Sequence, residues 1–293
     1  MHIVFIGYGK TSQRVAKQLF AQGHQISTIS RSPKTDLFAQ HYVQDVHHLD
    51  LSTFAPIDWV YVLLSPDQSS VEGYQQTYVD SVAPIVAALH SHPVKKVVVV
   101  SSTRVYGENT GQKIDDDSLI QPIDAQGHLL WEMERRWQQA YPEQSIIIRP
   151  SGIYGDSVAR MCKLAKNTSI YPNTHWSNRI HVDDLAGFLA YLTALPQHQP
   201  SYIVTNAQPT LLHEVLEWFQ QQLALPRLTV AHPEQISGKC LYATHLQQSG
   251  FQLQHADCFQ DYAALLAQQS ARCLAGYVLD RKSTRLNSSH RCL

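Results

Sequence analysis

Continuous apolar segments in the first half of the chain predict buried β-strands. They lack the alternation that is typical of a half-exposed sheet, and segments with helical spacing of apolar positions separate them. The predicted strands are 2–6, 25–30, 59–64, 97–101 and 146–149. The predicted helices are 12–22, 74–90 and 127–140. Strands that alternate with helices predict an α/β fold with a doubly wound parallel sheet.

After Pro150 the pattern is less regular, and it predicts a smaller C-terminal lobe that is also α/β. The elements expected there are a helix over 183–194, a strand over 202–205, and helices over 211–223, 241–249 and 258–269. We assign 1–155 to the main domain, to which 178–224 partly returns, and 156–177 together with 225–279 to the smaller lobe.

The last stretch, 280–293, is polar and has no apolar periodicity. It resembles the translation of a DNA-sequencing library adapter, so we expect it to be foreign to the natural protein and exclude it from the fold. The native end is then expected near Leu279, unless the gene was cut at that point. A natural polar terminus is the alternative interpretation.

Composition and charge limit the expected partners. Hydrophobic residues make up 44% of the chain and charged residues 16%, which is typical of a folded chain and excludes general disorder. The formal net charge is -1 and no basic stripe recurs, so neither nucleic acid nor a membrane is an expected partner. A small-molecule substrate remains open, and we expect a monomer or a homodimer.

Targeting and metal-binding signals are not found in the sequence. The apolar runs are shorter than the roughly 20 residues that span a bilayer, and the start lacks a signal-peptide pattern, so a cytoplasmic location is expected. The cysteines are widely spaced without a Cys-x-x-Cys pair, and the histidines do not repeat at ligand spacing. We therefore predict free, buried thiols and no metal.

A glycine-containing turn follows the first predicted strand and opens the first predicted helix. It contains Gly7, Gly9, Lys10, Thr11 and Ser12. The first glycine permits the turn, the second lets a pyrophosphate approach the backbone, and the helix N-terminus offers amide donors. Ser12 replaces the usual third glycine and is small enough for close packing. The motif predicts a Rossmann-type dinucleotide site; the alternative is a turn that only connects strand and helix.

The end of the second predicted strand favours NADP over NAD. Ser30 and Arg31 stand where an NAD-binding sheet carries an acid, and a guanidinium with hydroxyls would bind a 2′-phosphate. The alternative is that Arg31 is a solvated surface charge. Asp50 is expected either to hold the adenine edge or to cap a turn. Ser65 and Ser101 are further expected cofactor contacts.

Three motifs in the later sequence resemble the extended short-chain dehydrogenase/reductase superfamily, in its NAD-dependent epimerase/dehydratase group. They are Val97–Gly107, Arg149–Gly155 and Arg179–Ala186, and residues 246–266 look like the family's terminal region. The resemblance spans nearly all of residues 1–270. It implies an oxidoreductase, epimerase or dehydratase that acts on a sugar-nucleotide or small carbonyl substrate held under the smaller lobe.

The resemblance also implies catalytic positions. Ser102, with Thr103 beside it, corresponds to the serine that hydrogen-bonds the substrate oxygen. The family's acid/base tyrosine and the lysine four residues later fall on Gln126 and Leu130, and neither replacement titrates near neutral pH. The chain is therefore similar to atypical members of the family, and Tyr106 is a candidate catalytic residue.

The loss of the tyrosine–lysine pair leaves three interpretations open. In the first, hydride chemistry continues with another proton donor, for which Tyr106, Tyr154, His128 and Glu132 are candidates. In the second, the protein binds NADP without turnover and reports the redox state to a partner. In the third, the cofactor site has decayed and the cleft binds something else, although Arg31 argues against this.

The third motif also contains His181, Asp183 and Asp184. We predict that these residues order a loop and cap the following helix rather than take part in the chemistry.

Overall fold

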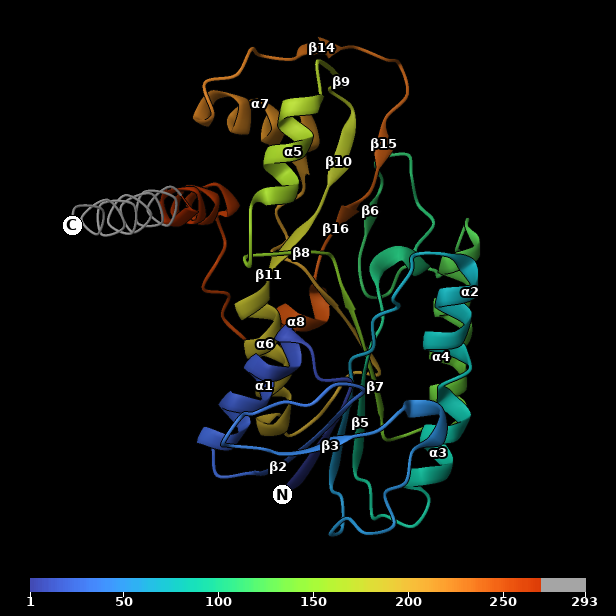
Figure 1. Cartoon of the computed structure of the whole chain (residues 1–293). Helices are drawn as coiled ribbons and strands as arrows, with labels where there is room; N and C mark the ends of the chain where they lie inside the picture. Colours follow the sequence, from blue (N-terminus) through green and yellow to red (C-terminus); the bar gives the residue numbers. More distant parts are fainter. Residues whose placement is uncertain (270–293) are drawn as a thin grey trace, which may run out of the picture.

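The structure is a computed structural model of the chain, and it describes residues 1–269. The predicted foreign tail, 280–293, lies outside the described residues. Within residues 1–269, seven strands form one parallel sheet (Figure 1) in the order β12-β7-β5-β4-β1-β2-β3. These strands are β1 His2–Ile6, β2 Gln25–Ser30, β3 Gln40–Val43, β4 Trp59–Val62, β5 Lys96–Val100, β7 Ser145–Pro150 and β12 Ser201–Val204. The predicted doubly wound α/β fold is confirmed.

The strand order reverses on the two sides of β1. The chain leaves β1 towards β2 and β3 on one side and returns to β4 on the other. In the register of the sheet, Ile6 lies opposite Ile29 of β2 and Val62 of β4. The carboxyl ends of the three strands therefore meet at one level, and ligands of open α/β sheets bind at such a switch point.

Helices cover both faces of the sheet, as predicted. Helices α1 Lys10–Ala21 and α6 Val182–Tyr191 pack together on one face, and the other face carries α3 Val82–Leu89 and α4 Ala125–Ala140 (Figure 1). α1 buries Val15, Ala16 and Leu19 against the sheet. This is the apolar stripe from which the helix was predicted.

The second and third helices differ in detail from the prediction. The expected helix over 74–90 begins at α2 Val71–Tyr74, because Ser70 Oγ accepts a hydrogen bond from the amide of Gly73 at 3.1 Å. It continues as a π-helical segment, Gln75–Val79, before α3. The strand predicted over 59–64 ends at Val62.

A second hydrophobic core lies beyond the carboxyl ends of the sheet. It is formed by α5 Ala159–Asn167, α7 Leu212–Gln222 and the helix over residues 258–269. Short strand pairs surround it: β8 Gly152–Tyr154 with β11 Arg179–His181, β9 Ile170–Pro172 with β14 Thr229–Ala231, and β10 His175–Ser177 with β13 Thr210–Leu211 and β15 Ser237–Gly238. Helix α7, at 211–223 in the prediction, belongs to this core rather than to the sheet.

One strand pair links this region back to the loops above the sheet. β6 Lys113–Ile114 pairs with β16 Cys240–Leu241, so the helical stretch predicted over 241–249 is shortened to α8 Thr244–Gln248. Residues 1–269 also contain single turns of 3₁₀-helix at Val46–His48, Thr103–Val105 and Leu192–Ala194. None of the helices in residues 1–269 is long and apolar enough to cross a bilayer.

Candidate functional site

A cavity of ≈ 1050 Å³ opens at the carboxyl ends of β1, β2, β3 and β4. Of the residues predicted to bind a cofactor, the cavity is lined by Gly7, Gly9, Ser30, Arg31 and Ser65. Residues that were not predicted also line it: Lys34, Asp45, Val46, Leu63, Asp67 and Gln68 among others. The cavity lies at the switch point of the sheet, which is where this kind of fold binds nucleotides.

Gly7 is required by the geometry of the turn. Its φ is +88°, and a Cβ at this position would lie 2.2 Å from the carbonyl oxygen of Leu63. The Gly7 amide donates to the Ile29 carbonyl at 3.0 Å. Ser12 closes the turn from the helix side, because its buried Oγ donates to the Gly7 carbonyl at 2.8 Å. Ser12 therefore positions the turn and does not line the cavity itself.

Gly9 has a different environment. Its backbone is extended (φ −92°, ψ −169°), and a Cβ built on it meets no atom within 4 Å. The glycine therefore leaves open a space at the cavity wall into which a bulky group can approach the backbone.

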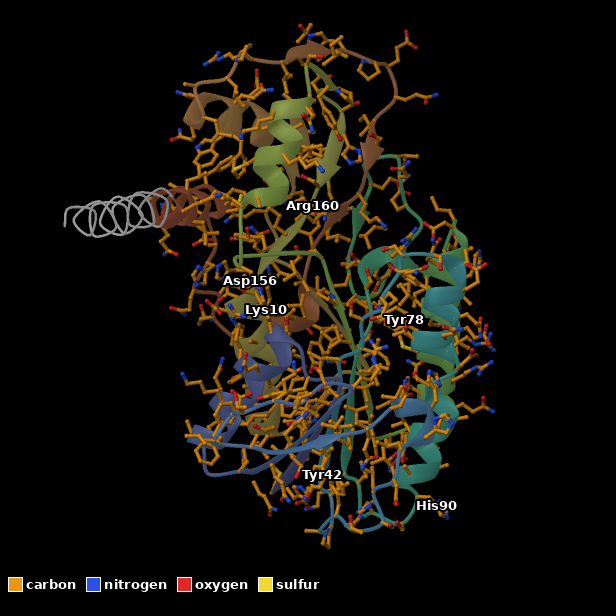
Figure 2. The ribbon with its side chains drawn as sticks, in the orientation of Figure 1. Lys10, Tyr42, Tyr78, His90, Asp156 and Arg160 are labelled. Atoms are coloured by element: carbon orange, nitrogen blue, oxygen red, sulfur yellow. The ribbon has the colours of Figure 1, made fainter. Side chains whose placement is uncertain are left out.

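The N-terminus of α1 faces the same opening. The first turn has no acidic residue, and no side chain caps it, so its amides and the helix dipole are free to bind an anion. These observations fit a pyrophosphate, which Gly9 and the amides of Lys10, Thr11 and Ser12 would hold. The Lys10 side chain is 77% exposed, lies 3.9 Å from Asp156 (Figure 2) and does not line the cavity.

The end of β2 holds an ion pair that the sequence did not predict. Both terminal nitrogens of Arg31 donate to Asp67, each at 2.7 Å. The Arg31 guanidinium lowers the pKa of the Asp67 carboxyl. Ser30 Oγ donates to the carbonyl of Ser32 at 2.8 Å. We expected a strand end free of carboxylate, and this was wrong for the folded site, because the loop after β4 supplies one.

Of the two acids Asp45 and Asp50, only Asp45 lines the cavity. Asp50 is exposed and outside the cavity lining, and its carboxylate accepts the amide of Ser52 at 2.9 Å, which is the turn-capping alternative. Asp45 directly follows β3 and lines the cavity with Val46. β3 is short and has mixed polarity, so its end could not be located from periodicity.

The serines after β5 lie outside this cavity. Ser101 is buried and its Oγ has no hydrogen-bond partner. Ser102 is half-buried, and its Oγ accepts the amide of Arg104 at 3.2 Å. Thr103 Oγ1 donates to the carbonyl of Pro150 at 3.4 Å. Ser102 and Thr103 remain predicted substrate contacts, whereas Ser101 is enclosed in the protein.

The positions of the family's tyrosine and lysine carry no acid or base. The amide oxygen of Gln126 accepts from Arg104 at 3.4 Å, and its nitrogen donates to the carbonyl of Ser69 at 3.3 Å. Leu130 is 1% exposed and belongs to the main hydrophobic core. Arg104 is paired with Asp124 at 3.0 Å.

Tyr106 lies in the protein core. It is 1% exposed, and its hydroxyl accepts a hydrogen bond from Arg149 at 2.8 Å. Arg149 is itself buried and paired with Glu134 at 2.6 Å. Burial raises the pKa of Tyr106 to about 12. This geometry argues against Tyr106 as a proton donor and indicates that it orders a buried ion pair.

The other candidate donors are also placed unfavourably. The Tyr154 hydroxyl donates to Asp261 at 2.6 Å, and burial raises its pKa well above its usual range. Glu132 is paired with Arg136 on the exposed face of α4 at 2.5 Å. His128 is exposed on the same helix.

Lys239 lies beneath the Ser102–Tyr106 turn and was missed in the sequence. Its ammonium donates to the carbonyl of Thr103 at 3.2 Å and to the carbonyl of Tyr106. Burial lowers its pKa. Lys239 is 136 residues from Thr103 and 133 residues from Tyr106 in the sequence, so no local signal could have predicted the contact.

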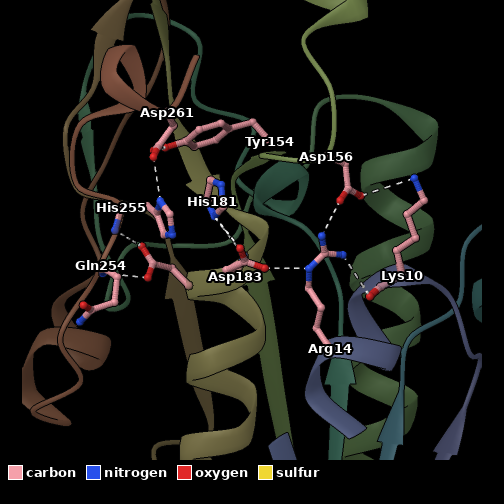
Figure 3. A network of polar contacts seen from close by, with 10 residues as sticks. Lys10, Arg14, Tyr154, Asp156, His181, Asp183, Gln254, His255 and Asp261 are labelled. Atoms are coloured by element: carbon pink, nitrogen blue, oxygen red, sulfur yellow. Dashed lines mark hydrogen bonds and ion pairs between the residues drawn. The ribbon is translucent and has the colours of Figure 1, made fainter. Parts of the chain in front are cut away.

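A polar network links α1 to the second core (Figure 3). Arg14 is paired with Asp156 at 2.6 Å and with Asp183 at 2.7 Å. Helix α6 is capped by His181, whose Nδ1 accepts the amide of Asp183 at 3.2 Å. The helix cap predicted for this motif is present, and His181 forms it.

Asp184 carries out the loop ordering expected of the same motif. Its two carboxylate oxygens accept the amides of Gln254 and His255 at 2.8 and 2.9 Å.

His181, Asp183 and His255 offer possible metal-ligand atoms within 4.8 Å of one another. The rings of His181 and His255, however, stack 3.6 Å apart at 14°. Their nitrogen lone pairs lie in nearly parallel planes and do not converge on one point. The expectation of no metal remains a prediction.

A doubly wound sheet with an open glycine turn and a cavity at its switch point defines a Rossmann-type dinucleotide-binding protein. The sequence pattern of the NAD dependent epimerase/dehydratase family matches residues 7–206. The chain belongs to this family, as the sequence motifs indicated.

Several proteins of known sequence or structure are similar to this chain. Protein YeeZ of Escherichia coli K12 is 25% identical over 217 residues, covering 71% of this chain and 75% of YeeZ. A solved structure assigned to the NAD-dependent epimerases/dehydratases, from Methylobacillus flagellatus, is 30% identical with a TM-score of 0.78 and covers 92% of this chain and 98% of its own. The UDP-glucuronic acid 4-epimerase of Bacillus cereus, in complex with NAD, shares the fold at 14% identity, with a TM-score of 0.73 and coverage of 92% and 99%.

Proposed function

We propose that this chain binds NADP(H) in the cavity at the switch point and acts on a sugar-nucleotide or small carbonyl substrate. The observation that carries the proposal is the open wall at Gly9, next to an uncapped helix N-terminus, in a cavity that Arg31 also lines. In this arrangement the pyrophosphate would lie over Gly9, and the adenosine ribose would lie beside Ser30 and Arg31. Arg31 and Lys34 favour a 2′-phosphate, hence NADP over NAD.

The substrate class is supported by relatives. MoeE5 has been solved with UDP-glucose and NAD, and it shares the fold at 17% identity with a TM-score of 0.76 over 93% of this chain and 99% of its own. For this chain, Ser102 and Thr103 would contact the substrate oxygen, and residues 156–177 and 225–279 would form the substrate lobe over the domain 1–155. We further propose a cytoplasmic monomer or homodimer.

A second candidate function is an NADP-binding redox sensor that does not turn over its cofactor. It is favoured by one observation: the positions of the tyrosine–lysine pair hold Gln126, whose amide is hydrogen-bonded, and Leu130, which is buried. Of the phenols predicted as replacement donors, Tyr106 lies in the core and Tyr154 donates to Asp261. A protein of this kind would keep the cofactor site and lose the proton donor.

Two measurements test these functions. Calorimetric titration of the chain with NADPH and with NADH, with Arg31→Ala as the matched variant, tests the cofactor. We expect NADPH to bind more tightly than NADH, and the Arg31 change to remove the difference. Absence of binding of both dinucleotides would refute the proposal.

Oxidation of NADPH in the presence of UDP-sugars and small aldehydes or ketones then separates the two candidates. Turnover that is lost in Ser102→Ala supports the enzyme. Binding without any turnover, together with a protein interaction that depends on the NADPH to NADP ratio, supports the sensor.

A further inference from the structure

The ion pair between Arg31 and Asp67 spans the cofactor cavity. Arg31 follows β2, whereas Asp67 lies in the loop after β4, and both line the same cavity. The contact is bidentate, with both nitrogen–oxygen distances at 2.7 Å. Asp67 therefore occupies the donors that a phosphate would use, since carboxylate and phosphate bind the guanidinium fork in the same way.

The pair is exposed enough to exchange partners. The side chains of Arg31 and Asp67 are 62% and 70% exposed, and exposed ion pairs contribute only about 0–1 kcal/mol. A 2′-phosphate, with a charge of about −2 at neutral pH, can displace the carboxylate. Binding of the phosphate costs the free energy of the lost ion pair, and repulsion from Asp67 opposes it further if that side chain stays in the cavity.

We propose that Asp67 is an internal competitor for the 2′-phosphate and thereby sets how strongly this site discriminates NADP from NAD. The inference rests on the proposed dinucleotide site. NAD has a free 2′-hydroxyl, so it can bind without breaking the Arg31–Asp67 pair. NADP has to break it. Asp67 therefore weakens NADP binding selectively, and the preference expected from Arg31 is only partly expressed.

Neighbouring charges do not remove this effect. Lys34 also lines the cavity and adds a second cation, whereas Asp45 adds a carboxylate on the adenine side. Asp67 differs from Asp45 in one respect that matters here. Asp67 has both oxygens on the Arg31 fork, whereas Asp45 Oδ1 accepts the amide of His47 at 2.9 Å.

The test is Asp67→Asn in the full chain, titrated with NADPH and NADH at low salt. Asp117→Asn is the charge-matched control, because this aspartate is 86% exposed and lies outside the cavity lining. We expect NADPH to bind about three- to tenfold more tightly in Asp67→Asn, from the loss of the competing pair and of the repulsion. NADH affinity is expected to stay within about twofold, and the gain to shrink at high salt.

Adenosine 2′,5′-bisphosphate and AMP, used in place of the full cofactors, should reproduce the same difference, since they differ only by the 2′-phosphate. When Arg31 is already alanine, Asp67→Asn should raise NADPH affinity only slightly, because it then removes only the repulsion between Asp67 and the 2′-phosphate.

The outcomes separate the inference from the proposed function. If NADPH and NADH both bind but their affinity ratio is the same in Asp67→Asn, in the control and in the parent chain, the inference is overturned and the site stands. An equal gain for NADPH and NADH also overturns it, because Asp67 would then act on the whole dinucleotide. If no dinucleotide binds to any variant, the proposed function fails and the inference fails with it. Thermal unfolding of each variant checks that the fold is retained.

Discussion

The two glycines of the turn between β1 and α1 make a matched pair for a stability and binding experiment. Gly7 and Gly9 are two residues apart, but alanine would meet opposite conditions at the two positions. At Gly7 the new Cβ would lie 2.2 Å from a backbone oxygen, with φ at +88°. At Gly9 the Cβ would meet no atom within 4 Å, and φ is −92°.

The magnitude for Gly7→Ala follows from two costs. The left-handed conformation costs an L-residue about 1–2 kcal/mol, and forcing extra atoms into a packed region costs about 1–3 kcal/mol. The clash is with the Leu63 backbone, which β-sheet hydrogen bonding holds in place. We therefore expect Gly7→Ala to lower the free energy of unfolding by about 2–5 kcal/mol.

For Gly9→Ala, the smaller entropy of the unfolded chain favours alanine by about 0.4–1 kcal/mol. The poorer N-cap propensity of alanine offsets this gain in part. The free energy of unfolding should stay within about 1 kcal/mol of the parent. The new methyl group would instead occupy the space that a pyrophosphate needs, so NADPH binding should fall at least about tenfold, which corresponds to about 1.4 kcal/mol.

Urea unfolding of both variants without dinucleotide, followed by calorimetry with NADPH, measures the two effects separately. Equal destabilisation by Gly7→Ala and Gly9→Ala would refute the steric argument. Normal NADPH affinity in a folded Gly9→Ala variant would refute the placement of the pyrophosphate.

Three further predictions concern the core and the polar network. Glu134→Gln leaves the buried Arg149 without its carboxylate, so the free energy of unfolding, measured by chemical denaturation, should fall by about 3–5 kcal/mol. A decrease below about 1 kcal/mol would contradict the burial of this ion pair. Leu130→Lys places an ammonium in the core and should lower the free energy of unfolding by several kcal/mol, so restoring the family's lysine should impair folding. The control, Leu130→Met, should lower it by less than about 1.5 kcal/mol. Equal unfolding midpoints for the two variants would show that position 130 reaches solvent. Burial lowers the pKa of His181 below 6.5 in the folded chain. As pH falls, the unfolded chain therefore binds a proton first, and stability should decrease below about pH 6.5. His181→Asn, which keeps an acceptor at the helix cap, should flatten this part of the stability–pH curve; an unchanged slope would show that other groups cause the slope.

Sequence reasoning succeeded where the physical cause is local. Strands that are buried on both faces are continuous in hydrophobicity, so β1, β4, β5 and β7 were predicted within a few residues. The glycine turn itself was predictable because strand, turn and helix are adjacent in the chain.

The residues that were missed depend on tertiary contacts. Asp67 meets Arg31 only because β4 lies beside β1 in the sheet, and the loop after β4 has no periodicity that would place its side chains. Lys239 reaches the Ser102–Tyr106 turn from the other end of the chain. Tyr106 was predicted as a candidate catalytic residue, because a sequence does not show that Arg149 will donate a hydrogen bond to its hydroxyl in the core.

The position of β12 at the edge of the sheet has a consequence for how the chain can be divided. β7 has β12 on one side and β5 on the other, and every residue of β7 is buried. A chain ending at residue 155 would lack β12, and the backbone of residues 147–150, which pairs with β12 in the sheet, would become an unpaired edge beside the buried Ile147 and Ile148. Such an edge invites pairing with a second copy and aggregation. The residues that line the proposed dinucleotide cavity all precede residue 80, but the sheet that carries them also needs the strand that begins at Ser201.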